Sequence, residues 1–283
     1  MTYIIPKSNT IKTPIALLRP RLPMLPKTHL IYFSPTGTTR KIIKQVASGL
    51  DSRDVEHHDL TRMEQEFSLC LDDGLVSFGV PVYAGRVPEI FLKRIENLSA
   101  KGIPAILVVL YGNRAYEDAL VELRDVITAK GFNVIAAAAF IGEHSYSTDE
   151  RPVAANRPDV GDMQKAREFG AAITNKLQGE CHQTTLDILG NTPYKERLPL
   201  GGICPETKPE LCTLCKTCAR VCPAFVITVN QEVSTEAGNC VMCCACVKLC
   251  PHNARVMRHP MVEARRDMLV TNCSERKEPS CYL

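Results

Sequence analysis

Two runs of cysteines near the C-terminus share one spacing, and this repeat limits what the chain can fold into more than any other feature. Each run reads C-x2-C-x2-C-x3-C-P, over residues 212–223 and again over residues 240–251. Three thiols separated by two residues can surround one corner of an inorganic cluster, and the fourth ligand must come from elsewhere. The repeat therefore predicts a small metal–sulfur domain. Its candidate ligands are Cys212, Cys215, Cys218, Cys222, Cys240, Cys243, Cys246 and Cys250.

This spacing is typical of [4Fe–4S] clusters, in which each of four irons takes one thiolate. Where two such runs occur together, the last cysteine of each run binds the other cluster. We therefore predict that Cys250 completes the cluster of the first run and Cys222 completes that of the second. The alternative is a pair of structural zinc sites, which usually combine two C-x2-C pairs rather than runs of three. The repeat thus favours two [4Fe–4S] clusters and electron transfer.

The remaining cysteines match no ligand spacing. Cys244 lies between two candidate ligands and is expected to be a buried thiol that binds no metal. We interpret the others as unligated, namely Cys70, Cys181, Cys204, Cys273 and Cys281. Because most cysteines concentrate in the two runs and no secretory signal precedes them, the expected compartment is a reducing cytoplasm.

The first 27 residues form a segment of unusual composition, with five prolines, five Lys or Arg and no acidic residue. Its apolar runs are too short to span a bilayer, so no membrane span is expected. We predict an extended N-terminal arm, with a role in targeting or partner docking as the alternative. A net charge of +3 says little about partners, and no segment resembles a nucleic-acid-binding patch, so no nucleic-acid partner is expected.

Between residues 28 and 178, short apolar runs alternate with amphipathic segments. This alternation predicts an α/β domain with a parallel sheet covered on both faces, and five strands fit the flavodoxin-like doubly wound order. The predicted strands span residues 29–34, 54–59, 74–80, 104–110 and 133–140. The predicted helices span residues 38–50, 88–97, 116–130 and 161–178.

The rest of the chain divides by composition into three parts. Residues 179–207 contain several Gly and Pro and are predicted to form a linker. Residues 208–258 make a small α+β two-cluster domain whose clusters supply much of its stability. Residues 259–283 are predicted to be a C-terminal tail.

The first strand leads into a hydroxyl-rich loop that precedes a helix. Such a loop forms an anion site, because its N–H groups and the positive end of the helix dipole face the anion. Neither G-x-x-x-x-G-K-[ST] nor G-x-G-x-x-G is present, so it matches neither a triphosphate loop nor a dinucleotide fingerprint. An ordinary capped helix is the alternative. The candidate phosphate ligands are Ser34, Thr36, Gly37, Thr38 and Thr39.

Residues 34–39 resemble the FMN-phosphate loop of flavodoxins, and with the eight cysteines the chain resembles the flavodoxin–ferredoxin fusion proteins of anaerobic prokaryotes. The resemblance implies FMN as a further cofactor. It places two flavin-ring loops at residues 81–88 and 111–116, after the third and fourth strands. Many flavodoxins stack the ring on a tryptophan, which this chain lacks. The implied ring contacts are Tyr83, Ala84, Gly85, Arg86, Gly112, Asn113, Arg114 and Tyr116.

Two functions fit these features. The first is an electron-transfer iron–sulfur flavoprotein that converts one-electron into two-electron transfer for a redox partner protein, a ferredoxin or an oxidoreductase. The second is an FMN-dependent oxidoreductase that reduces its own small-molecule substrate. His144, in a loop after the fifth strand, is the candidate proton donor for such a reaction; an ordinary surface loop is the alternative. The absence of a nicotinamide fingerprint favours the first function.

Overall fold

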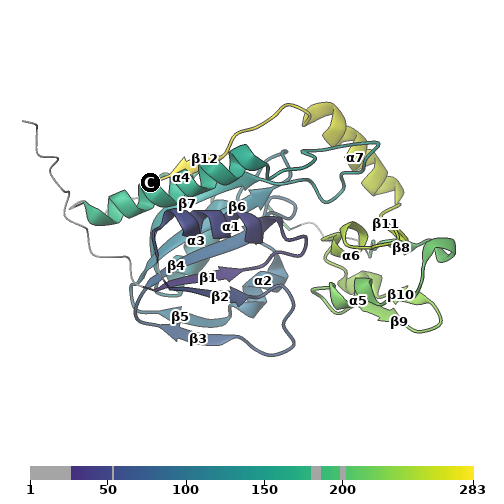
Figure 1. Ribbon diagram of the computed structural model, residues 1–283, viewed down its shortest axis with the longest axis horizontal. Coiled ribbons are helices and arrows are strands. Elements are labelled where there is room, and N and C mark those ends of the chain that lie inside the picture. Colours follow the sequence, from purple (N-terminus) through teal and green to yellow (C-terminus); the bar gives the residue numbers. More distant parts are fainter. Residues whose placement is uncertain (1–26, 53, 180–185, 198–201) are drawn as a thin grey trace, which may run out of the picture.

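The computed structural model describes residues 27–52, 54–179, 186–197 and 202–283, so residues 1–26 of the predicted arm and Cys181 lie outside it. An α/β domain and a smaller cysteine-rich domain lie side by side, and the C-terminal segment runs from the second back to the first (Figure 1). Within the described ranges, no helix combines the length and the apolarity needed to cross a membrane.

The α/β domain is built on a six-stranded sheet of order β12-β7-β6-β4-β1-β2. Its strands are β1 (Thr28–Tyr32), β2 (Val55–Asp59), β4 (Leu75–Pro81), β6 (Pro104–Tyr111), β7 (Asn133–Ile141) and β12 (Ser280–Tyr282). The first five in sequence are parallel and confirm the predicted doubly wound order. β12 is antiparallel to β7 and adds a sixth strand to the five predicted parallel ones. The tail supplies the sixth strand and covers the exposed backbone groups of the edge strand β7.

Helices cover both faces of the sheet. On one face, α1 (Thr38–Gly49) and α4 (Val160–Gln178) pack on β6 and β7. On the other, α2 (Glu89–Arg94) and α3 (Ala119–Ala129) complete the larger core. β3 (Ser68–Leu71) and β5 (Asn97–Ala100) form a small parallel pair beside the sheet, which the sequence pattern did not predict. The core strands are apolar on both sides, as a sheet between two helical layers requires.

Two glycines let α1 and α4 approach closely. A Cβ atom at Gly49 would lie 2.0 Å from the carbonyl oxygen of Arg167, and one at Gly170 would lie 2.1 Å from that of Val46. Backbone atoms cannot move aside as a flexible side chain can, so any larger residue would force the helices apart.

The cysteine-rich domain repeats one short unit. In each copy a 3₁₀ turn precedes the run and a one-turn helix holds its third cysteine. The first copy contains η1 (Pro209–Leu211) and α5 (Thr217–Arg220); the second contains η2 (Ala237–Asn239) and α6 (Ala245–Lys248). Two antiparallel strand pairs complete the domain: β8 (Glu206–Thr207) with β11 (Arg255–Val256), and β9 (Ile227–Val229) with β10 (Val233–Thr235).

The predicted tail folds into α7 (Pro260–Asn272) followed by β12, and it connects the two domains (Figure 1). On α7, Arg266 donates from Nε to the carbonyl oxygen of Tyr146 at 2.6 Å, and Asp267 accepts from Arg151 at 2.7 Å. Val262 of the same helix packs against Met242 in the second cysteine run. One helix therefore contacts both the α/β domain and the cysteine-rich domain.

Of the predicted linker, residues 186–197 have no regular secondary structure and are fixed to the α/β domain, whereas residues 206–207 form β8 of the cysteine-rich domain. The buried carboxylate of Asp118 accepts from the backbone N–H groups of Asn191 (2.8 Å) and Lys195 (2.7 Å). These hydrogen bonds hold the pKa of Asp118 below its usual range, against the effect of burial. Tyr194 donates to Asp125 at 2.6 Å. The linker is therefore part of the rigid body rather than a free tether.

We expect Gly170→Ala to destabilise the α/β domain, because the added methyl group would meet the Val46 carbonyl at 2.1 Å. Overpacking of this kind costs about 1–3 kcal/mol. Urea denaturation followed by far-ultraviolet circular dichroism measures the change. Gly179→Ala is the matched control, since a Cβ there meets no atom closer than 3.6 Å. Equal stability of the two variants would contradict the predicted clash.

Candidate functional site

The loop between β1 and α1 presents backbone donors to one point. Gly37 adopts a left-handed conformation (φ 82°), and its N–H donates to the carbonyl oxygen of Ser34 at 3.0 Å. The Ser34 hydroxyl accepts from the N–H of Arg40, also at 3.0 Å. Ser34 and Gly37 thus shape the loop from within. Among the described residues, nothing accepts a hydrogen bond from the N–H groups of Thr36, Thr38 or Thr39. The loop is therefore a set of unused donors at the positive end of a helix, as an anion site requires.

This loop borders a cavity with about 1370 Å³ of empty space, a volume that includes open solvent. The cavity lies at the carboxyl ends of the parallel strands, where doubly wound sheets bind ligands. Most predicted FMN contacts line it, namely Thr36, Thr38, Thr39, Tyr83, Ala84, Gly85, Gly112 and Arg114. We call it the large cavity.

The loop after β4 makes a tight turn at the cavity wall. Tyr83 and Arg86 exchange both backbone hydrogen bonds at 3.0 Å. The two residues between them, Ala84 (φ 52°) and Gly85 (φ 84°), are both left-handed, so the turn demands small residues. A Cβ at Gly85 would lie 1.8 Å from a carboxylate oxygen of Glu117. The turn holds backbone atoms, rather than long side chains, against the cavity.

Charged side chains form part of the cavity rim. Arg114 donates to Glu117 at 2.6 Å, and Lys195 of the linker donates to the other oxygen of the same carboxylate at 2.8 Å. The hydrogen bond between Arg114 and Glu117 raises the pKa of Arg114 and lowers that of Glu117. Arg265 of α7 lines the cavity as well. Glu143 also lines the cavity, so three cations stand against the two carboxylates of Glu117 and Glu143, a small positive balance that favours an anionic ligand.

Arg86 was predicted to contact the flavin ring, but the structure uses it elsewhere. Its guanidinium makes two hydrogen bonds to the buried carboxylate of Glu122, at 2.9 and 2.8 Å. It also donates to the carbonyl oxygen of Lys195 and lies 4.9 Å from the ring centroid of Tyr194. Arg86 does not line the large cavity and instead attaches the linker to α3. The sequence pattern does not give the position of the linker, so these contacts of Arg86 were not predicted.

Two further predicted ring contacts also lie outside the large cavity, since the C-terminal segment recruits them. Asn113 is buried, and its amide donates to the carbonyl oxygens of Cys273 (2.7 Å) and Glu275 (2.8 Å). The hydroxyl of Tyr116 lies 2.7 Å from that of Tyr282 on β12. Both residues hold the C-terminal segment against the α/β domain, so a cofactor role is replaced by a structural one.

His144 lines the large cavity opposite the phosphate loop's helix. Its Nδ1 accepts from the N–H of Tyr146 at 3.0 Å, so a neutral ring carries its proton on Nε2. Burial, together with the nearby cations Arg114, Lys248 and Arg266, lowers the pKa of His144 to about 4. Gly112 makes room for the ring, because a Cβ there would lie 2.4 Å from its Cδ2. At neutral pH, His144 is a neutral hydrogen-bond donor.

The cysteine-rich domain contains two cavities of similar size, about 310 and about 320 Å³ of empty space. Each cavity is bordered by the first three cysteines of one run and the last cysteine of the other. Those of the first cysteine cavity are Cys212, Cys215, Cys218 and Cys250. Those of the second cysteine cavity are Cys222, Cys240, Cys243 and Cys246, with Cys244 also on its wall. The fold thus brings together the two sets of four thiols that the crossed assignment predicts.

The two runs share one backbone conformation, which explains how Cys244 fits. Leu214 and Met242 are left-handed at equivalent positions, with φ of 55° and 51°. Lys216 and Cys244 are likewise left-handed, with φ of 62° and 56°. Cys244 therefore occupies a turn position rather than a ligand position. Its thiol is buried, lies 3.6 Å from the carbonyl oxygen of Met242, and has a pKa raised well above its usual range by burial.

Arg255 is a functional candidate that the sequence pattern did not identify. It is buried, donates to the hydroxyls of Thr207 (2.6 Å) and Thr235 (2.9 Å), and borders the first cysteine cavity. One guanidinium nitrogen lies 3.9 Å from the sulfur of Cys246, which borders the second. Its charge opposes the rise in thiol pKa that burial causes at both Cys218 and Cys246. Arg255 is placed to offset negative charge in both cavities.

The second cysteine cavity adjoins the large cavity. Val241 lines both, and Met242 beside it lines the large cavity. Tyr83 reaches the same boundary: burial raises the pKa of its phenol well above its usual range, and the neighbouring Cys243 thiol adds to the effect. The contacts that fix this boundary include Lys248 donating to Glu143 (2.5 Å) and Arg94 donating to the carbonyl oxygen of Pro223 (2.5 Å).

Comparison with protein families agrees with this geometry. Residues 30–170 match the flavodoxin family, and residues 205–228 match the 4Fe–4S binding domain. The chain joins a flavodoxin domain to a ferredoxin-type domain. The first match indicates FMN and the second indicates a 4Fe–4S cluster. The two domains together make the chain an iron–sulfur flavoprotein of the electron-transfer type.

Solved structures with similarity to the chain include flavodoxins. A flavodoxin from the domain Archaea is 15% identical, with a TM-score of 0.38 over 54% of this chain and 99% of its own. The TIGR4 flavodoxin of Streptococcus pneumonia is 16% identical, with a TM-score of 0.39 over 53% of this chain and 99% of its own. A comparison with curated proteins found none that matches the chain.

We expect Thr38→Ala to weaken FMN binding and to leave riboflavin binding nearly unchanged. The hydroxyl lies in the large cavity 3.3 Å from that of Thr36, where it can donate to a phosphate that riboflavin lacks. A hydrogen bond to a charged group contributes about 1.5–3 kcal/mol. Fluorescence titration of the flavin-free protein measures both affinities. Thr174→Ala, on α4 and outside the residues that line the large cavity, is the control and should bind FMN normally. Equal loss for both flavins would contradict a phosphate contact.

His144 should make the folded protein less stable in mild acid. Its pKa is about 4 in the folded protein and 6.5 ordinarily. As pH falls from 6.5 to about 4, the unfolded chain therefore gains a proton that the folded chain does not, and stability is lost. His144→Asn removes this titration and should lose less stability over the same range. Anaerobic urea denaturation at neutral pH and near pH 4.5 gives the comparison. An identical decline in both proteins would show that His144 titrates normally.

Proposed function

We propose that the chain is an electron-transfer protein in which two [4Fe–4S] clusters and FMN form a relay serving a redox partner protein. The observation that carries the proposal is the shared wall at Val241, which places the second cysteine cavity against the large cavity. The first cysteine cavity does not share this wall. The geometry therefore supports an order in which the partner exchanges electrons at the first cysteine cavity and FMN lies at the other end.

The residues of the large cavity fit FMN by the chemistry of their donors. The free N–H groups of Thr36, Thr38 and Thr39 would hold the phosphate, with the helix dipole of α1 behind them. The turn at Ala84 and Gly85 would present backbone atoms to the ring, and Tyr83 supplies an aromatic surface in a chain without tryptophan. Arg114 and Lys195 would offset negative charge on the ring.

The two cysteine cavities fit [4Fe–4S] clusters by their ligand sets of four thiols each. Burial raises the pKa of the Cys243 thiol far above its usual range and that of Cys246 to about 11. Such thiols stay protonated at neutral pH unless a metal displaces the proton. The cavities would therefore be stable as thiolate sites only with a metal bound, and Arg255 would offset part of the added charge.

Bound FMN exchanges one or two electrons, and each cluster exchanges one, so together they can connect single-electron carriers to a two-electron reaction. The chain's own residues set the order of these groups and exclude water between them. Met242 and Tyr146 pack with Val262 of α7 at the junction and keep it apolar. Exposed apolar side chains beside the first cysteine cavity, at Leu211 and Leu214, offer a surface for a protein partner.

A second candidate function is supported by His144 and the size of the large cavity. A neutral His144 can donate a hydrogen bond from Nε2 to a carbonyl or carboxylate of a small substrate, and Arg114 and Arg265 favour an anionic one. With a pKa of about 4, His144 holds little transferable proton at neutral pH. We therefore assign it a role in orienting a ligand rather than in acid catalysis.

The relay is tested by removing one ligand from each cysteine cavity in anaerobically prepared protein. Cys222→Ala should remove the cluster beside the large cavity, although Cys222 belongs to the first run. Cys250→Ala should remove the other cluster. Electron paramagnetic resonance identifies the remaining cluster, and stopped-flow absorbance follows FMN reduction by a reduced ferredoxin. We expect Cys222→Ala to abolish fast FMN reduction while its remaining cluster still accepts electrons.

Cys204→Ala is the matched control, because Cys204 is a half-buried cysteine that borders neither cysteine cavity. It should retain about eight iron and eight sulfide per chain, as two four-iron clusters require. Stoichiometric zinc without sulfide would refute the clusters. Fast FMN reduction in Cys222→Ala would refute the order of the relay.

A further inference from the structure

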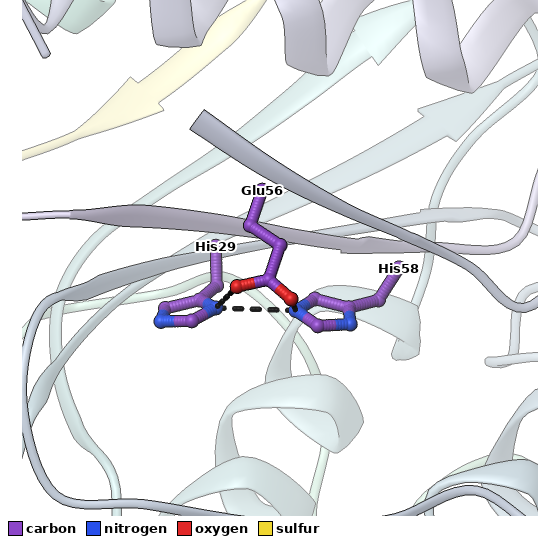
Figure 2. Close-up of side chains that lie close together, drawn as sticks. All are labelled: His29, Glu56 and His58. Atoms are coloured by element: carbon purple, nitrogen blue, oxygen red, sulfur yellow. Dashed lines mark hydrogen bonds and ion pairs between the residues drawn. The ribbon is translucent and has the colours of Figure 1, made fainter. Parts of the chain in front are cut away.

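Three potential metal ligands meet on one face of the sheet, away from both the large cavity and the cysteine cavities. They are His29 on β1 and Glu56 and His58 on β2 (Figure 2). His29 pairs with Glu56 in the parallel register, and His58 lies two residues farther along β2, so all three side chains point to the same face. None of them belongs to a sequence motif, since strand pairing alone brings them together.

The distances between their ligand atoms are close to those expected around a tetrahedral metal ion. His29 Nδ1 and His58 Nε2 are 3.1 Å apart; one oxygen of Glu56 lies 3.5 Å from the first nitrogen, and its other oxygen lies 3.7 Å from the second. Zinc–nitrogen and zinc–oxygen bonds of about 2.0–2.2 Å in a tetrahedron place ligand atoms roughly 3.3–3.6 Å apart. Figure 2 shows the two ring nitrogens facing each other, with one carboxylate oxygen of Glu56 beside each. A metal ion would need only small side-chain adjustments.

The protein groups alone do not fully satisfy this arrangement. One proton can be shared between the two facing nitrogens, but His29 Nε2 is buried and has no hydrogen-bond partner among the described residues. A metal ion on Nδ1 would leave Nε2 as a buried N–H without a partner, so the ion does not relieve the cost of this unpaired polar atom. The observation that favours a metal ligand set is the facing pair of ring nitrogens with a carboxylate oxygen of Glu56 beside each. Lys27 holds the carboxylate of Glu56 at 2.5 Å and would remain beside it.

We propose that His29, Glu56 and His58 form a Zn²⁺ site with an open fourth position for water. Two imidazoles and a carboxylate suit zinc better than calcium or magnesium, which prefer oxygen ligands. Both rings are largely buried, with side-chain exposures of 4% for His29 and 12% for His58, whereas Glu56 is 42% exposed and leaves the site open on one side.

The position of the site indicates a stabilising rather than a catalytic role. It lies near the start of β1, whereas the large cavity begins at Pro35, beyond the other end of that strand. β2 is an edge strand, and among the described strands of its sheet it pairs with β1 alone. A metal bound by both strands would fix β2 to the strand that leads into the phosphate loop. Because the metal binds only the folded chain, it would raise the melting temperature.

The test uses cluster-loaded protein, so that the cysteines are occupied, and zinc chloride as the probe. Isothermal titration calorimetry measures the affinity, and zinc analysis after desalting measures the stoichiometry. We expect one zinc per chain in the wild type and a higher melting temperature with zinc. His58→Ala and Glu56→Gln should bind roughly 100-fold more weakly or worse, because even residues that merely orient ligands cost about 10- to 100-fold.

His57→Ala is the matched control, because His57 lies between the two ligands on β2 but on the opposite, exposed face, against Tyr32. It should bind zinc like the wild type. Glu56→Gln keeps the size of the side chain and guards against loss of folding in His58→Ala; circular dichroism without zinc checks both. Unchanged visible absorbance shows that the clusters stay in place. Failure of the wild type to bind zinc, or equal binding by His57→Ala and Glu56→Gln, would overturn the proposal.

Discussion

The exchange of one cysteine between the two runs is the constraint on which the small domain depends. Cys222 borders the cavity of the second run, and Cys250 borders that of the first. Neither run can therefore complete a set of four thiols alone, and the two halves must fold together. The shared backbone conformation of the runs makes the exchange symmetric, since the segment after each third cysteine takes the same path. In a domain too small for a large apolar core, this mutual dependence replaces packing as the source of order.

The same exchange determines how the domain meets its neighbour. Pro223 follows Cys222, and its carbonyl oxygen accepts from Arg94 of the flavodoxin domain. Phe225 lies under the guanidinium of Arg62, 4.3 Å from the ring centroid. Lys248, on the helix that carries Cys246, donates to Glu143 and to the carbonyl oxygen of Ser147. These contacts all come from residues near the second cysteine cavity, so the junction brings that cavity, rather than the first, to the carboxyl edge of the sheet.

Local patterns predicted most of the fold, because strands and helices of the flavodoxin domain carry their own hydrophobic periodicity. The run from Ile106 to Leu110 is apolar throughout and is the centre of β6. β12 could not be predicted in this way, since three residues are too few to show a period and only the free edge of β7 gives them a partner. α7 was missed because its apolar residues serve two different domains rather than one continuous core.

The same distinction between local patterns and long-range contacts applies to the site residues. The cysteine sets and the phosphate loop were predictable, because their chemistry depends on spacing within one short segment. The hydrogen bonds of Arg86 to the linker and of Asn113 to the C-terminal segment were not predicted, because the partners are more than a hundred residues away in the sequence. The histidines of β1 and β2 were missed for the opposite reason: strand register, not spacing, brings His29 within reach of His58.

Arg255 is placed by strand pairing together with side-chain hydrogen bonds. Its position directly before the end of the domain gives no local signal, yet β11 pairs with β8 and carries its side chain between the two cysteine cavities. Its hydrogen bonds to Thr207 and Thr235 fix the guanidinium, so the charge cannot move away toward solvent. In the proposed relay, a buried cation between the two clusters would stabilise their reduced forms and raise their reduction potentials. Arg255 reaches both thiol sets, since it borders the first cysteine cavity and lies 3.9 Å from the sulfur of Cys246 in the second, so one cation would act on both potentials.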